Sequence, residues 1–403
     1  MKILQINSVL NIGSTGRIAE ELGQISIEKG WNSYIAYGRE FRGESKSKTF
    51  KIGNKLDFYA HLVTTRLFDR HGFGSKRTTK NLIRYIKGIG PDVVVLHNIH
   101  GYYLNIEILF DFLKEYNKPV FWILYDCWSF TGHCAYFDLV GCEKWQKDCF
   151  NCPCKNSYPK SLVCNSSKNF NDKRRIFNGI ENLNLIVHSD WLRKSIGKSF
   201  LKNYPVSLIR NGVNLDNFKP KEDNKIRDKY NLGNKFVILG VASVWGERKG
   251  FKDFLLLSEI LTDEIIIMDG LSKEQERLLP VNIISIGKAP NVIELASIYS
   301  TADVFFNPTY EDNFPTTNLE SMACGTPVIT YDTGGSPEAV DDMTGFVCEK
   351  RNINEVYSKI KTIKEVGKQN YAKNCVDRAN KLFDYKERYA ECVDFFEKVF
   401  KQN

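Results

Sequence analysis

Short apolar runs, each followed by a polar turn and then a helical pattern, recur along the whole chain and limit its possible folds more than any other feature. The clearest runs lie at residues 3–9, 31–37, 92–97, 120–126, 183–189, 236–241, 265–270, 282–288 and 303–306. Runs of this length between turn signals are typical of strands buried on both faces of a parallel sheet. The alternation occurs twice and predicts an α/β fold with two doubly wound sheets.

The length and composition agree with a globular protein of two or more domains. The chain has 403 residues, of which 42% are hydrophobic and 26% are charged. No run approaches ~20 uninterrupted apolar residues, so we expect no transmembrane helix. The first seven residues are too few and too polar for a signal peptide, and we expect a cytoplasmic location. The eleven cysteines are then expected to be thiols or metal ligands and not disulfides.

The formal net charge of +8 has two interpretations. It can reflect ordinary solubility, or it can attract anionic lipid headgroups and phosphorylated substrates. Lysines and arginines are scattered, without a dense basic run interleaved with aromatic residues. We therefore predict no nucleic-acid partner.

Residues 307–335 have the pattern strand, loop, helix, strand, with carboxylates in the loop and in the helix. The loop carries Glu311 and Asp312, and the helical pattern from Thr316 carries Glu320. Gly325 marks its end. A helix start offers unpaired N–H groups and a partial positive charge, which suit an anion or a hydroxyl-rich ligand. The spacing also fits two surface carboxylates that stabilise the helix start by ~0.3–1 kcal/mol each.

This stretch resembles the signature of the family 4 retaining glycosyltransferases, which have the GT-B fold. In that signature two acidic residues are separated by seven and are followed by a small-residue tail. Asp312 and Glu320 have this separation, and residues 321–328 (SMACGTPV) supply the tail. The first acidic residue is usually Glu. The variant found here, DNFP at 312–315, resembles the branch that builds exopolysaccharide, colanic-acid-type and O-antigen chains.

The resemblance covers essentially the whole chain and implies two Rossmann-like domains that face each other across a cleft. Residues 1–200 would form the acceptor-side domain, with a Cys-rich insertion at 127–164. Residues 201–380 would form the domain that binds the nucleotide sugar. Residues 381–403 would form a C-terminal helix, which in GT-B proteins usually returns to the first domain.

In the second domain the resemblance implies a set of donor contacts. Glu320 would bind the donor through its ribose, and Asp312 would hold the sugar. Lys249 keeps the family's Lys-Gly pair, whereas Arg248 stands next to it and not at the usual earlier position. Both would stabilise the departing diphosphate, because fixed cations can do so without a metal; alternatively they are a solvated basic pair. The remaining donor-binding residues would be Gly287, Asn313, Phe314, Pro315 and Thr316.

In the first domain a glycine-containing loop follows the first strand. Its spacing is Gly-x-x-Gly, so the dinucleotide fingerprint is absent, and the spacing taken alone favours a tight turn between strand and helix. In the resembled family this loop lines the inter-domain cleft near the donor phosphates. Gly13, Gly16 and Arg17 are therefore predicted donor-binding residues.

Three residues at strand ends are predicted on the acceptor side, namely His97, Tyr125 and Asp126. Many relatives have His-Asp where this chain has Tyr125-Asp126. A tyrosine can donate a hydrogen bond, but its unperturbed pKa near ~10 makes it a poor base at neutral pH. Residues 38–79 are polar and basic, with a helical pattern near 56–67, and in GT-B enzymes such regions often carry acceptor-facing loops.

The insertion contains a cysteine cluster. Cys149 and Cys152 have the two-residue spacing that lets two thiolates reach one tetrahedral ion. We predict a structural zinc on Cys134, Cys142, Cys149 and Cys152, with His133 in reserve. Reduced thiols or an iron–sulfur cluster are the alternatives. No cofactor is expected to take part in catalysis.

The predicted function is retaining transfer of a sugar from a UDP- or GDP-sugar to a hydroxyl of a lipid-linked glycan, in the synthesis of cell-surface polysaccharide. Peripheral contact with the inner face of the cell membrane is expected. Another GT-B activity, such as an epimerase or phosphorylase, is one alternative. A non-catalytic protein that binds sugar nucleotides is the other.

Overall fold

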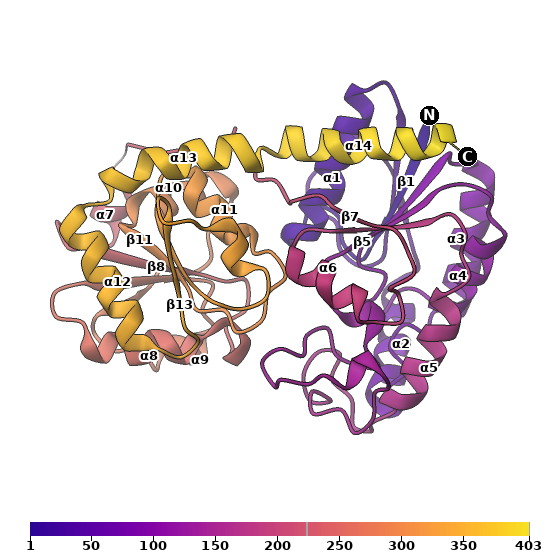
Figure 1. The fold of residues 1–403 in the computed structure, drawn as a ribbon, viewed down its shortest axis with the longest axis horizontal. Helices are drawn as coiled ribbons and strands as arrows, with labels where there is room; N and C mark the ends of the chain where they lie inside the picture. The colour runs from indigo at the N-terminus through magenta and orange to yellow at the C-terminus, as the bar shows by residue number, and fades with distance from the viewer. Residues whose placement is uncertain (223–224, 403) are drawn as a thin grey trace. The chain divides into compact units, whose positions relative to one another are not determined.

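The computed structural model of the protein describes residues 1–222 and 225–402 (Figure 1). The chain forms two units, each with its own parallel sheet. The first comprises Met1–Arg210 together with the chain from Arg388 onward, and the second comprises Asn211–Glu387. None of the helices in the described residues is both long and apolar enough to span a membrane.

The sheet of the first unit has seven parallel strands in the order β3-β2-β1-β4-β5-β6-β7. Most of its strand residues are apolar and buried, as expected for a parallel sheet covered on both faces. The strands are β1 (Lys2–Asn7), β2 (Asn32–Tyr37), β3 (Lys48–Lys51), β4 (Val93–Leu96), β5 (Val120–Leu124), β6 (Leu183–Val187) and β7 (Val206–Leu208).

Helices cover both faces of this sheet (Figure 1). They are α1 (Gly13–Glu28), α2 (Lys55–Phe68), α3 (Lys76–Ile89), α4 (Ile106–Glu115), α5 (Ser166–Phe177), α6 (Asp190–Gly197) and α14 (Tyr385–Gln402), the last from Arg388 onward. On β5 the ring of Phe121 lies 4.4 Å from that of Phe396 in α14, whereas the ring of Trp122 lies 4.9 Å from that of Phe177 in α5. Because successive strand residues point to opposite faces, α14 and α5 lie on opposite sides.

The segment between β5 and α5 contains little regular structure. It has two 3₁₀ turns, η1 (Trp128–Phe130) and η2 (Lys144–Gln146). Its own aromatic cluster packs it together, with the Trp145 ring 5.1 Å from Phe130 and 4.7 Å from Phe137. Packing of these rings therefore stabilises the insertion in the absence of long helices or strands.

The second unit has a six-stranded parallel sheet in the order β10-β9-β8-β11-β12-β13. Its strands are β8 (Val237–Val241), β9 (Ile265–Asp269), β10 (Ile283–Ser285), β11 (Val304–Asn307), β12 (Val328–Tyr331) and β13 (Gly345–Cys348). Its helices are α7 (Lys225–Lys229), α8 (Phe251–Ile260), α9 (Lys273–Glu276), α10 (Val292–Thr301), α11 (Thr316–Ala323), α12 (Ile353–Val366) and α13 (Gln369–Phe383), with 3₁₀ turns η3 (Glu247–Lys249) and η4 (Ser336–Ala339). The predicted fold class, two doubly wound parallel α/β sheets, is confirmed.

The strand order of each sheet reverses at one point. In the first unit the chain proceeds outward from β1 to β3 and then returns to β4 on the other side of β1. In the second unit it proceeds from β8 to β10 and returns to β11 on the other side of β8. Ligands of open α/β sheets bind at such switch points, outside the carboxyl ends of the strands. The topology therefore directs attention to the loops after β1, β4, β8 and β11.

Candidate functional site

At the switch point of the second unit, the loop after β8 is joined to the loop after β11. The backbone N–H of Tyr310 donates to the carbonyl of Arg248 at 2.8 Å. The guanidinium Nη1 of Arg248 donates in return to the carbonyl of Glu311 at 2.8 Å. These reciprocal bonds hold the predicted cations and the predicted carboxylate loop side by side.

Lys249 and Asp312 form an ion pair between these two loops. Lys249 Nζ lies 2.5 Å from Asp312 Oδ2, and the side chains are 19% and 16% exposed. Burial lowers the pKa of Lys249, and the nearby charge of Arg248 lowers it further, whereas Asp312 acts in the opposite direction. The pair therefore places a cation, which can bind an anionic group, next to a carboxylate, which can bind hydroxyl groups.

Two glycines let the surrounding backbone approach this pair closely. Gly250 has φ +70°, and a Cβ there would lie 2.3 Å from the carbonyl oxygen of Pro308. Gly334 has φ +55°, and a Cβ there would lie only 1.9 Å from the carbonyl oxygen of Asp312. The N–H of Gly335 donates to the same oxygen at 3.1 Å. The glycine loop after β12 thus fixes the backbone that carries Asp312.

Glu320 lies on α11, the helix that follows the Asp312 loop. Its side chain is buried, and Oε2 accepts a hydrogen bond from the hydroxyl of Tyr299 at 3.1 Å. Asp269, at the end of β9, is close enough that the Glu320 charge adds to burial in raising the pKa of Asp269. Glu320 is therefore positioned from α10 and faces the carboxyl end of the sheet.

The other predicted donor residues lie on the same edge of this sheet. Asn313 and Phe314 are buried, Pro315 precedes the first residue of α11, and Thr316 is that first residue. No side chain caps the start of α11. Gly287 follows β10 with φ +72° and open space around its Cα, and its carbonyl accepts from the N–H of Gly270 at 2.7 Å.

In the first unit, the loop after β1 forms the start of α1. Gly13 is the first residue of the helix and is exposed, with φ +63° and open space around it. Gly16 is buried, and a Cβ there would lie 3.1 Å from the backbone nitrogen of Asn11. Arg17 follows on the same turn and is half-buried. The three predicted residues therefore share the first turn of α1, next to the switch point of this sheet.

His97 and Tyr125 are joined by a hydrogen bond at the ends of β4 and β5. His97 is 1% exposed, and its Nε2 donates to Gln5 Oε1 at 2.9 Å. In the neutral ring Nδ1 then accepts from the Tyr125 hydroxyl at 2.8 Å. Burial lowers the pKa of His97 to about 3 and raises the pKa of Tyr125 well above its usual value. Both side chains are therefore neutral at physiological pH.

Asp126 is held by two hydrogen bonds. Its Oδ1 accepts from the N–H of Trp128 at 2.9 Å, and its Oδ2 accepts from His100 Nε2 at 2.9 Å. His100 Nδ1 in turn lies 2.9 Å from the hydroxyl of Tyr158. The three residues predicted on the acceptor side thus lie in two hydrogen-bonded groups at the carboxyl ends of β4 and β5.

Comparisons with known proteins relate part of this chain to glycosyltransferases. Residues 222–382 match the family model "Glycosyl transferases group 1". These residues therefore carry the sequence pattern of this family. The chain's glycosyltransferase relatives include the putative colanic acid biosynthesis glycosyl transferase WcaC of Escherichia coli K12, which is 32% identical over 188 residues, or 44% of this chain and 45% of WcaC.

A further curated relative and a solved structure were also found. One is the N,N'-diacetylbacillosaminyl-diphospho-undecaprenol α-1,3-N-acetylgalactosaminyltransferase of Campylobacter jejuni, which is 26% identical over 196 residues, or 44% of this chain and 51% of that enzyme. The chain thus spans about half the length of the curated relatives it matches. The other is the Anabaena HepE structure in complex with UDP-glucose, with a TM-score of 0.66, 15% identity and coverage of 99% and 100%, which shows the shared GT-B fold.

The predicted structural zinc is not supported. The four predicted ligands line a cavity of about 10 Å³. However, within residues 1–222 and 225–402 no group of three or more His, Cys, Asp and Glu side chains is placed to hold a metal ion. The thiol of Cys134 interacts with Cys152 and with Cys154, which was not among the predicted ligands, and these contacts raise the pKa of Cys134 well above its usual value. Cys149 Sγ accepts a hydrogen bond from the N–H of Gly132 at 3.2 Å.

The sequence did not point to two residues of the second unit that interact with Glu320, namely Asp269 and Tyr299. Asp269 could have been noticed, because an Asp-Gly pair directly after a buried apolar run marks the carboxyl end of a strand. Tyr299 gave no signal, because a single tyrosine inside a helical pattern is usually a core residue. Only the structure reveals that its hydroxyl is directed at Glu320.

Proposed function

We propose that this protein is a nucleotide-sugar-dependent glycosyltransferase that transfers a sugar with retention of its anomeric configuration. The observation that carries the proposal is the Lys249–Asp312 pair at the β8/β11 switch point. At this position a cation can bind the anionic diphosphate of a sugar donor, and a carboxylate can bind the hydroxyls of its sugar ring.

In this proposal each group of the second unit has a separate role. Lys249 and Arg248 bind the diphosphate and stabilise its growing charge as the bond from the sugar C1 to the phosphate oxygen breaks. Asp312 and the backbone of residues 313–316 hold the sugar hydroxyls. Glu320 accepts hydrogen bonds from the ribose, and the Tyr299 hydroxyl positions Glu320. The acceptor oxygen forms the new bond to C1, and its proton passes to the leaving phosphate on the same face of the sugar.

We further propose a UDP- or GDP-sugar as donor and a hydroxyl of a lipid-linked glycan as acceptor. The HepE structure holds UDP-glucose, and the name of the Campylobacter jejuni relative specifies an acceptor linked to undecaprenol by a diphosphate. The name of WcaC specifies colanic acid biosynthesis, which favours a role in the synthesis of cell-surface polysaccharide. His97, Tyr125 and Asp126 belong to the acceptor side in this proposal.

The test begins with a panel of UDP-, GDP- and ADP-sugars screened by thermal shift, followed by transfer assays with the sugar that binds. Lys249→Ala and Glu320→Ala are each expected to lower kcat/KM by at least about 10²-fold. Lys252→Ala and Glu259→Ala are matched controls, because both are exposed residues of the neighbouring helix α8. Near-normal turnover in either site variant, with the controls active, would contradict the assigned roles. Anomeric analysis of the product by NMR tests retention.

A further inference from the structure

A buried hydrogen bond joins the start of α8 to the loop that carries Asp312. The hydroxyl of Tyr310, two residues before Asp312, donates to Oδ1 of Asp253 at 2.8 Å. Tyr310 is 7% exposed and Asp253 is 3% exposed. Asp253 lies in the first turn of α8, four residues after Lys249. The bond therefore connects the two chain segments that carry the Lys249–Asp312 pair.

The ring and the backbone of Tyr310 make further contacts. The centroid of its ring lies 5.6 Å from that of Tyr331, and the guanidinium carbon of Arg351 lies 5.3 Å from it. A cation at this distance from an aromatic ring is attracted to it. The carbonyl of Tyr310 accepts from the hydroxyl of Thr333 at 2.8 Å. Tyr310 is therefore held through its backbone and its ring as well as through its hydroxyl.

The carboxylate of Asp253 needs this hydrogen bond, because a buried charge is costly without polar partners. Burial raises the pKa of Asp253. The hydroxyls of Tyr310 and Tyr331 act in the opposite direction, as does the charge of Arg351. Among the described residues, however, the Tyr331 hydroxyl makes no hydrogen bond of ordinary length and angle. Tyr310 is therefore the tyrosine that compensates the buried carboxylate by a hydrogen bond.

We propose that Asp253 and Tyr310 are positioning residues, which set how the backbone segments of Lys249 and Asp312 lie relative to each other. The inference rests on the proposed function of this pair. Two hydrogen bonds connect the Asp312 loop to Arg248, and with these alone the loop could pivot about that residue. The bond to Asp253, about one helical turn further along the chain, prevents such a pivot.

Tyr310→Phe removes only the hydroxyl that makes the bond. We expect kcat with the nucleotide sugar to fall about tenfold, since a displacement of ~1 Å at a reacting centre can cost about 10²-fold. The donor KM is expected to change less than about threefold, because Tyr299 anchors Glu320 independently.

Tyr331→Phe is the matched control. It removes the same atom near the same carboxylate, but Tyr331 lies on β12 and not on the Asp312 loop. Its kcat is expected to stay within about twofold of the unaltered protein.

Two comparisons separate positioning from a general loss of packing. In an Asp312→Asn background, Tyr310→Phe is expected to cause little further loss, because residues that act through one another are not additive. Asp253→Asn is expected to retain most of the activity, since the amide oxygen can accept the same hydrogen bond. Asp253→Ala is expected to lose about as much kcat as Tyr310→Phe.

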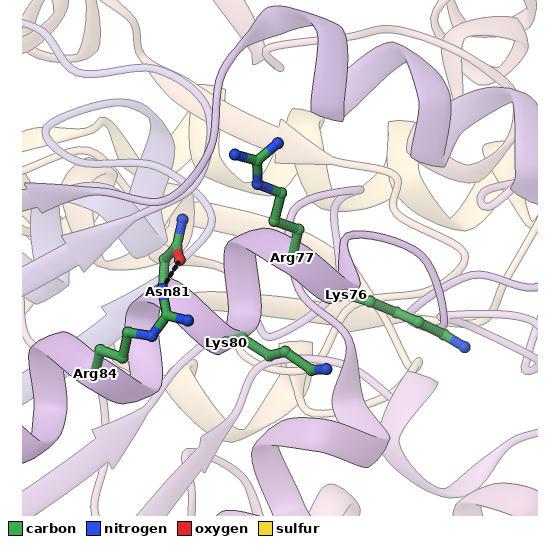
Figure 2. Close-up of a pocket in the computed structure, with 5 residues that line it drawn as sticks. All are labelled: Lys76, Arg77, Lys80, Asn81 and Arg84. Atoms are coloured by element: carbon green, nitrogen blue, oxygen red, sulfur yellow. Dashed lines mark hydrogen bonds between the residues drawn. The ribbon is translucent and has the colours of Figure 1, made fainter.

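Hydrogen exchange followed by mass spectrometry tests the bond without any turnover. Amides of residues 308–314 are expected to exchange at least about tenfold faster in Tyr310→Phe and at an unchanged rate in Tyr331→Phe. Lys80→Gln is a control in the other unit. It removes one of the exposed cations that line a pocket of about 480 Å³ on α3 (Figure 2). Exchange of the 308–314 loop should not respond to it.

Three results would overturn the inference. They are unchanged exchange of the 308–314 loop in Tyr310→Phe, equal losses of kcat in Tyr310→Phe and Tyr331→Phe, and a full additional loss in the Asp312→Asn background. Faster exchange of the loop in a protein that transfers no sugar would instead count against the proposed function alone. Failure of the positioning role is therefore distinguishable from failure of the proposed transfer reaction.

Discussion

Gly334→Ala provides a direct test of how the glycine loop after β12 positions Asp312. A Cβ at residue 334 would lie 1.9 Å from the carbonyl oxygen of Asp312, where no side-chain rotation can relieve the overlap because both partners are backbone-linked. The loop carrying Asp312 must therefore move by about 1 Å or more to restore an ordinary contact. A displacement of ~1 Å at a reacting centre can reduce activity by about 10²-fold.

The energetic cost has two parts that can be separated. Gly334 has φ +55°, and alanine in this left-handed region costs about 1–2 kcal/mol. Gly233, in the same unit, has φ +53° but nothing within 4 Å of a Cβ. Gly233→Ala is therefore destabilised only by the unfavourable backbone conformation. Gly334→Ala is destabilised in addition by the overlap of its Cβ with the carbonyl oxygen of Asp312. We expect about 1–2 kcal/mol of destabilisation for Gly233→Ala and about 2–4 kcal/mol for Gly334→Ala.

Differential scanning calorimetry of the full chain measures the stability of each variant, and donor affinity by titration calorimetry measures the site. We expect Gly233→Ala to retain donor binding and turnover, and Gly334→Ala to lose about 10²-fold in kcat/KM while remaining folded at low temperature. Equal stability losses for both variants together with an intact donor site in Gly334→Ala would refute the reasoning. It would mean that the loop does not determine where Asp312 lies.

Two further predictions concern buried polar groups. Burial lowers the pKa of His61 and His188 to about 4 and of His97 to about 3. Because the unfolded chain titrates near ~6.5, it binds more protons below that pH, and the free energy of unfolding should fall between about pH 6.5 and 4, by up to ~1.4 kcal/mol per pH unit for each histidine. Urea unfolding followed by tryptophan fluorescence measures the free energy of unfolding at each pH, since five of the six tryptophans lie in the first unit. A free energy of unfolding that does not change over this range would contradict the prediction. His97→Gln should reduce the slope of the free energy of unfolding against pH. In the second unit, Tyr299→Phe should lower kcat/KM by about 5–10-fold without unfolding, because Glu320 loses one hydrogen bond; an unchanged donor KM and kcat would exclude the positioning role.

The fold was predictable because its strands are almost purely apolar and end in turn residues. Val93–Leu96 and Val120–Leu124 are fully or nearly fully buried and read as strands without any other information. Which face of α2 is buried could not be predicted in this way. The helical pattern near 56–67 indicates a helix, but periodicity alone assigns the apolar stripe to the core. In the structure His61 is buried because the N–H of Gly72 and the hydroxyl of Ser75 supply its hydrogen-bond partners. These residues lie 11 and 14 positions further along the sequence, so the helical pattern alone does not indicate them.

The candidate site was predictable in part. Resemblance to a family signature pointed to Asp312, Glu320 and Lys249, while the carboxylate spacing alone fitted surface residues equally well. The contact between Lys249 and Asp312 joins residues 63 positions apart, which only the adjacency of β8 and β11 brings together. For the cysteine cluster, by contrast, the sequence prediction was not supported. Ligand-like spacing indicates which thiols can meet, but the packing of the insertion brings Cys154 to Cys134 as well.

The contrast between the two switch points bears on where the acceptor proton goes. At the end of β4 and β5, His97 is neutral with both nitrogens engaged, and the pKa of Tyr125 is raised by burial. A histidine with a pKa of about 3 is a weak base, and a buried tyrosine is a weaker acid than usual. Both oxygens of Asp126 already accept hydrogen bonds. None of these groups is therefore suited to remove a proton from a sugar hydroxyl at neutral pH.

At the β8/β11 switch point, by contrast, Lys249 offers a cation to a departing phosphate. Such a phosphate can accept the proton itself as its negative charge develops. This division favours the route in which the leaving group acts as the base, and it explains how a tyrosine can replace the usual histidine at residue 125 without loss of the proposed chemistry.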